Sequence, residues 1–140
     1  MELNQEQLAE VQFMVQQLQI VLGTDNDARK GAEEHLKKIK EGEPDKYACY
    51  LTAVIIDATA SLEIKALASV VLRRSIGSPL PSKENKTLWE VLSAQARDYL
   101  KDNLLKFNRT ITTKDLIHKV SNLLVEVAGG MYEYENEIVW

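Results

Sequence analysis

Residues that could catalyse a reaction or bind a metal are few and scattered along this 140-residue sequence. His35 and His118 are its only histidines, and neither belongs to an HExxH motif or a Cys/His cluster, so no metal site is expected. The single cysteine, Cys49, lies in the apolar run KYACYLTAV, which predicts a buried thiol. No serine or cysteine stands in a recognisable setting with a histidine and a carboxylate. The sequence therefore predicts no catalytic, cofactor-binding or metal-binding residues.

The overall charge argues against two classes of partner. The formal net charge is −4 and the pI is about 5.3, whereas nucleic acids and anionic membranes attract dense Lys/Arg patches. No stretch approaches the roughly 20 apolar residues of a membrane span. The polar start MELNQEQLAE lacks the apolar core of a secretory signal. We therefore expect a protein of the cytosol or nucleus, with neither nucleic acid nor a membrane as its partner.

Apolar residues recur every three or four positions, which predicts six helices and no sheet. The expected helices cover about residues 5–22, 27–41, 44–58, 62–76, 85–107 and 113–128. Asn4 and Gln7 have the spacing of a capping box, and Pro44 suits the first turn of the third helix. Gly129-Gly130 is expected to end the last helix.

The even-numbered helices share one pattern, an apolar residue at i, i+4 and i+8. The three sets are Ala28/Ala32/Leu36, Ile64/Ala68/Leu72 and Leu116/Val120/Leu124. The first two sets are 36 residues apart, a spacing typical of helical-pair repeats. Such pairs bury their apolar faces on one another in an α-solenoid. A compact six-helix bundle would carry similar stripes, so the pattern alone leaves both architectures open.

Particular segments resemble a known family. Leu22–Arg29 followed by Ala32-Glu33-Glu34 resembles the opening of the second helix in the first HEAT repeat of importin-β-type receptors. Ala66–Ile76, ALASVVLRRSI, resembles the second helix of their second repeat. Trp89 with Leu92 and Leu104-Leu105 is similar to the first helix of their third repeat. The wording ASVVLRR resembles the importin-five (karyopherin beta three) branch most.

The resemblance implies an all-α fold, an α-solenoid of three HEAT-type antiparallel hairpins in a right-handed superhelical stack. Repeat one would cover residues 5–41, repeat two 44–77 and repeat three 85–130, with 131–140 beginning a truncated fourth. Family members have many more repeats, so the chain is expected to be an N-terminal fragment. The outer face of its last helical pair should then be partly bare and prone to weak self-association.

The resemblance also implies a function. The chain would be the N-terminal part of a nuclear import receptor, which binds GTP-bound Ran to drive cargo release and shuttles between cytoplasm and nucleus. Cargo proteins and nucleoporins would bind the repeats missing here. A HEAT scaffold subunit without GTPase dependence is the alternative, and an enzyme is the least favoured class.

Helical phase selects candidate contact residues. In the fourth helix the apolar stripe centres near Ala68 and Leu72, which predicts that Ser69 and Arg73 point away from the core and that Arg74 lies on the flank. In importin-β receptors the second helix of each pair lines the concave surface. By that resemblance the expected Ran-binding residues are Lys30, Glu33, Lys37, Ser69, Arg73, Arg74, His118 and Asn122. Glu33 and Lys37 are also spaced for an i, i+4 ion pair.

Overall fold

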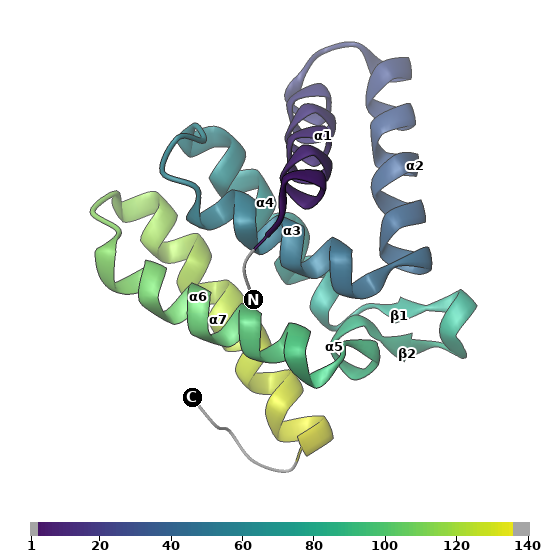
Figure 1. Cartoon of the computed structure of the whole chain (residues 1–140), viewed down its shortest axis with the longest axis vertical. Coiled ribbons are helices and arrows are strands. Elements are labelled where there is room, and N and C mark those ends of the chain that lie inside the picture. Colours follow the sequence, from purple (N-terminus) through teal and green to yellow (C-terminus); the bar gives the residue numbers. More distant parts are fainter. Residues whose placement is uncertain (1–2, 136–140) are drawn as a thin grey trace.

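The computed structural model describes residues 3–135, and helices dominate it (Figure 1). The α-helices are α1 (Gln5–Leu22), α2 (Asn26–Gly42), α3 (Pro44–Ile56), α4 (Leu62–Ile76), α5 (Leu88–Val91), α6 (Ala94–Thr110) and α7 (Lys114–Glu135). Two short strands, β1 (Pro79–Leu80) and β2 (Lys86–Thr87), enclose the 3-10 turn η1 (Pro81–Lys83). The prediction of an all-α fold is confirmed.

Polar caps set the starts of the first helices. The Asn4 side chain accepts a hydrogen bond from the Gln7 backbone N–H at 2.8 Å, and Gln7 Oε1 accepts one from the Asn4 N–H at 2.9 Å. Two N–H groups that would otherwise lack partners are thereby satisfied. Ser61 caps α4 in the same sense by accepting from the Ile64 N–H. The predicted bounds of α1 and α4 are confirmed.

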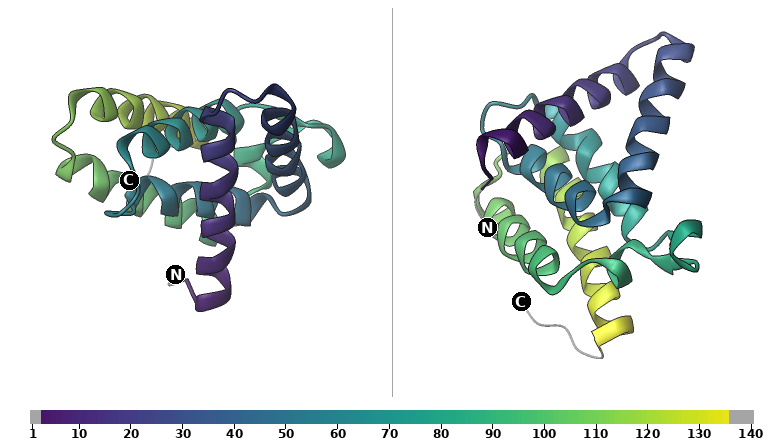
Figure 2. Two further views of the ribbon diagram at one scale, coloured as in Figure 1. Left: turned by 90° about the horizontal axis from the view of Figure 1, so that it is seen from above. Right: turned by 45° about the vertical axis from the view of Figure 1, so that its right-hand side comes forward.

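Three antiparallel helical pairs stack side by side: α1 with α2, α3 with α4, and α6 with α7 (Figure 2). Helix α3 packs on α6 while α4 packs on α7, and α1 lies across both α3 and α4. This stacking confirms the solenoid. Helix α2, however, packs mainly on α1 and α3. Helices α4 and α7 therefore share one layer, and α2 lies outside it.

The core runs through all three pairs without a break. Leu18 of α1, Leu51 of α3 and Leu72 of α4 are completely buried, as are Leu100 of α6 and Leu123 of α7. Because each pair buries its apolar face on the next pair, the stability of each repeat depends on its neighbours.

The expected fifth helix from 85 to 107 is wrong, because two helices replace it. Thr87 caps the single turn α5 by accepting from the Glu90 N–H, and Leu92 then leaves the helix with ψ of 140°. Ser93 starts α6 by accepting from the Ala96 N–H at 3.1 Å. A serine N-cap inside an apolar periodic run is the signal that the helical pattern concealed.

The expectation of no sheet also fails, at one small hairpin. Pro79 pairs with Thr87 and Leu80 with Lys86 in antiparallel register. Glu84 and Asn85 both have positive φ, 58° and 62°, which lets the chain reverse between the strands. Two residue pairs are too few to produce a visible alternation in the sequence.

Gly129-Gly130 does not end the last helix, because α7 continues to Glu135. Gly130 is buried, and a Cβ atom there would lie 2.7 Å from the Trp89 ring. The glycine therefore serves packing between α5 and α7 rather than helix termination. Residues 131–135 extend α7 and do not begin a fourth repeat, while 136–140, including Trp140, lie outside the described residues.

The outward side of α7 carries apolar residues that none of the helices within residues 3–135 covers. Val125 is 67% exposed and Tyr132 69% exposed, and Ile117 lies two turns before Val125 on the same side. A bare apolar helix face favours association with another surface. The self-association expected at this end of the molecule stays a prediction.

Truncating Leu72 to alanine should lower the free energy of unfolding by about 2–5 kcal/mol, because the change opens a cavity in the central repeat. Lys37→Ala should cost under about 1 kcal/mol, since Lys37 is exposed and forms no ion pair in the described part of the chain. Urea denaturation of both variants gives the comparison. Equal losses would contradict the assigned helix faces.

Adjacent glycines in α7 give a second stability test. Gly130→Ala should destabilise the protein by about 1–3 kcal/mol, because the new methyl group meets the Trp89 ring. Gly129→Ala should instead stabilise it by about 0.5–1 kcal/mol, since nothing lies within 4 Å of the new Cβ and alanine favours a helix. Thermal melts of the two variants should shift in opposite directions; a shared direction would rule out the packing role.

Candidate partner-binding surface

Helix α4 presents only part of the predicted face to solvent. Arg74 is exposed and Arg73 is half-buried, whereas Ser69 is completely buried. The Ser69 hydroxyl donates to the Lys65 carbonyl oxygen at 2.9 Å, inside the packed side of the helix. The prediction that Ser69 faces a partner is therefore wrong.

The reason is that α4 is enclosed over a wider arc than its apolar stripe indicates. It contacts α3, α7 and α1, so polar residues beside the stripe are buried too. Ser75 shares a 2.8 Å hydrogen bond with the Tyr47 hydroxyl. Lys65 is buried with its ammonium 5.1 Å from the centre of the Phe107 ring, a cation–π contact at the last turn of α6.

The α2 candidates lie on the surface. Ala32 and Leu36 face the core, while Lys30, Glu33 and Lys37 are exposed. The expected ion pair between Glu33 and Lys37 does not form in the described structure. All three side chains are thus available to another molecule.

Helix α7 places its two candidates at the surface as well. Leu116 and Val120 are buried against α4 and α6, while His118 and Asn122 are exposed. Because α7 packs beside α4, these residues share one side-by-side helix pair with Arg73 and Arg74. The α2 residues belong to a helix that packs elsewhere, so the seven surface candidates do not form one continuous strip.

A groove that the sequence reading missed runs along the outward side of α4. Its volume is about 600 Å³, and it lies between the end of α1 and the first turns of α7. Apolar side chains form much of it, and charged side chains border it. The apolar residues are Leu22, Leu62, Ala66, Leu67 and Val70, and the charged residues are Glu63, Arg74, Asp115 and Lys119.

One pattern in the sequence indicates this groove. Leu62, Ala66 and Val70 follow one another at i, i+4 and i+8 on the side of α4 opposite to Leu72. A helix that is apolar on two opposite sides is usually covered on both. Of the eight predicted contact residues, only Arg74 lines the groove.

Residues 3–135 contain no cluster of three or more potential metal ligands, and none of the helices there is long and apolar enough to cross a membrane. Burial, with the Asp45 charge nearby, raises the pKa of the Cys49 thiol to about 12, so the thiolate is not populated at neutral pH. The prediction that Cys49 is buried is confirmed.

The fold is shared with a solved structure whose subject is the binding of Kap95p to RanGDP. In that structure Kap95p binding induces the switch loops of RanGDP to adopt the GTP-bound conformation, in the context of nuclear import complex assembly. The similarity has a TM-score of 0.72 at 21% sequence identity, and it covers 86% of this chain but only 14% of that chain. No curated protein sequence matches. At this identity the likeness concerns the fold alone, and the importin-five branch stays a prediction.

A family model supplies the sequence-level assignment. The model of the importin-beta N-terminal domain matches residues 32–109, which is more than half of the chain. The matched segment extends from the middle of α2 to the end of α6, across the second helical pair and its contact with the third. The chain therefore belongs to the importin-β N-terminal domain family.

Proposed function

We propose that the chain is the N-terminal region of a nuclear import receptor and that it binds GTP-bound Ran. The family assignment and the open groove on α4 together carry this proposal. The groove offers an apolar floor with Arg74 and Lys119 at its border, and partner interfaces commonly combine an apolar centre with a charged rim.

The proposed mechanism is a shift between receptor conformations. Ran binding would favour one curvature of the solenoid and cargo binding another, so that each ligand lowers the affinity for the other. Cargo and nucleoporin contacts are assigned to repeats beyond the 14% of the matched receptor chain that this chain spans. The proposal places the receptor in cytoplasm and nucleus and gives it no catalytic role.

In the proposed complex the groove contributes apolar burial and its rim contributes electrostatic attraction. Val70 sits in the groove and is half-buried, so a partner side chain would complete its burial. Arg74 is exposed at the rim and would attract acidic groups of the partner, mainly by speeding association. Arg73 is half-buried, so part of its predicted contact would have to be made by its aliphatic stem.

Introducing a charge into the groove should weaken GTP-Ran binding. Val70→Asp is expected to reduce affinity about tenfold or more, because it places a carboxylate in the desolvated centre of the contact. Arg74→Glu should act mainly on the association rate and on its dependence on salt, with Arg73→Glu following the same direction. Calorimetry and stopped-flow mixing with GTP-loaded Ran measure both effects.

Lys106→Glu is the matched control, because Lys106 is exposed on α6 away from the groove and the change in net charge equals that of Arg74→Glu. It should leave affinity unchanged. GDP-loaded Ran should bind the wild-type chain more weakly than GTP-loaded Ran. Equal binding of both nucleotide forms, or none by either, would favour a HEAT scaffold without GTPase dependence. Thermal melts of each variant show whether the fold is intact.

A further inference from the structure

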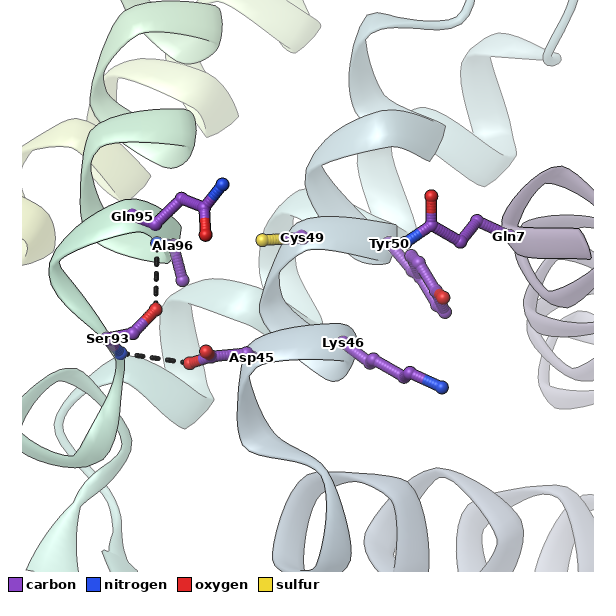
Figure 3. Close-up of a pocket in the computed structure, with 8 residues that line it drawn as sticks. All are labelled: Gln7, Asp45, Lys46, Cys49, Tyr50, Ser93, Gln95 and Ala96. Carbon is purple, nitrogen blue, oxygen red and sulfur yellow. Dashed lines mark hydrogen bonds between the residues drawn. The ribbon is translucent and has the colours of Figure 1, made fainter. Parts of the chain in front are cut away.

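Two neighbouring depressions share the side chains of Lys46 and Tyr50 on α3. The larger has a volume of about 220 Å³ and lies against Phe13 and Met14 of α1 and Ile39 of α2. The smaller, of about 60 Å³, lies between α3 and the start of α6 (Figure 3). No residue assigned above to the GTPase contact lines either one, so this surface is separate from the proposed Ran site.

Acidic side chains dominate the charge around the two depressions. Glu10, Glu43 and Asp45 line them together with a single basic residue, Lys46, which leaves three negative charges against one positive. The Lys46 ammonium is already engaged, because it lies 3.0 Å from Glu43 and 3.5 Å from Glu10. Three carboxylates and one ammonium give the lining residues a net charge of −2, and Lys46 is the one cation among them.

Polar contacts hold the walls in place before any ligand arrives. The Tyr50 hydroxyl donates to Glu10 Oε2 at 2.6 Å, which fixes the ring between the two depressions. Burial, together with that carboxylate, raises the pKa of Tyr50, so the hydroxyl stays a donor at neutral pH. Asp45 accepts a hydrogen bond at 2.9 Å from the Ser93 backbone N–H, as drawn in Figure 3. Sites preformed in this way lose little free energy to ordering when they bind.

The size and lining of the larger depression select the ligand. An apolar cavity of about 150 Å³ can hold a benzene ring, so about 220 Å³ is sufficient for a phenylalanine-sized side chain. Phe13, at its edge, is 42% exposed, and such a contact would cover it further. We propose that this surface binds a segment of a partner protein in which a bulky apolar side chain stands next to a lysine or arginine. The apolar group enters between α1, α2 and α3, and the cation pairs with the acidic rim.

A short fluorescein-labelled Gly/Ser peptide with a central Lys-Phe-Lys sequence probes the 140-residue chain by fluorescence polarisation. Replacing its Phe by Ala should weaken binding about tenfold or more, because the apolar contact is lost. Replacing both Lys by Glu should abolish measurable binding. Raising the ionic strength should weaken the original peptide, since its attraction to the rim is screened.

Variants of the protein locate the site. Phe13→Asp should lower the affinity for the Lys-Phe-Lys peptide about tenfold, because the apolar contact is lost. Leu8→Asp is the matched control, since Leu8 is 50% exposed on the same helix and does not line the depression. Glu43→Lys should weaken binding severalfold, whereas Glu34→Lys, on the exposed part of α2, should not. GTP-Ran affinity should be unchanged in Phe13→Asp, which separates this site from the proposed function.

Three outcomes would overturn the proposal. The first is no saturable binding of the Lys-Phe-Lys peptide to the wild-type chain. The second is equal binding of the Glu-flanked peptide, which would show that the acidic rim does not contribute to binding. The third is equal weakening by Leu8→Asp and Phe13→Asp with unchanged melts, which would show adsorption to α1 instead of a defined pocket.

Discussion

Helix α4 contacts α1, α3 and α7, so this one helix joins all three helical pairs. Ala68 is completely buried on this helix, and its small side chain permits close helix approach. Leu72 fills the space one turn later. Residues beside the stripe are consequently enclosed as well, so Lys65 and Ser69 are structural although both are polar. Among residues 3–135, the side of α4 that stays open to another molecule is the one that carries the groove.

The two proposed surfaces lie at different junctions between helices. One lies on the outward side of α4, beside α7, and the other lies around the first turns of α3, between α1 and α6. The first is built from side chains of three helices and the second from side chains of four, which no single helix could bring together. A solenoid exposes many such inter-helix junctions, because its pairs stack in a line instead of closing around one centre.

Local sequence signals were sufficient where the structure is local. The Asn4–Gln7 capping box predicted a helix start that the structure confirms. Such signals could not predict contacts made at a distance. Gly130 was predicted to end the helix, but a side chain there would clash with Trp89, which lies some forty residues earlier in the chain. The local sequence around Gly130 carries no sign of that contact. Ser69 was predicted to be exposed because it lies away from the apolar stripe of its helix. Burial also depends on how many helices pack around that helix, and α4 contacts three of them. The groove on α4 likewise needed the ends of α1 and α7 to be placed.

The contact between Trp89 and Gly130 gives the molecule an intrinsic optical reporter. Trp89 is one of two tryptophans in the sequence, and its ring is completely shielded from water by packing against α7. Arg97 also holds this region together, because its guanidinium lies 5.4 Å from the ring and donates to the Trp89 carbonyl oxygen. Replacing Trp140 by phenylalanine would leave Trp89 as the single tryptophan. The wavelength and intensity of its fluorescence would then report the docking of the third helical pair without any attached dye. Loosening of that pair could then be followed apart from the unfolding of the rest of the chain.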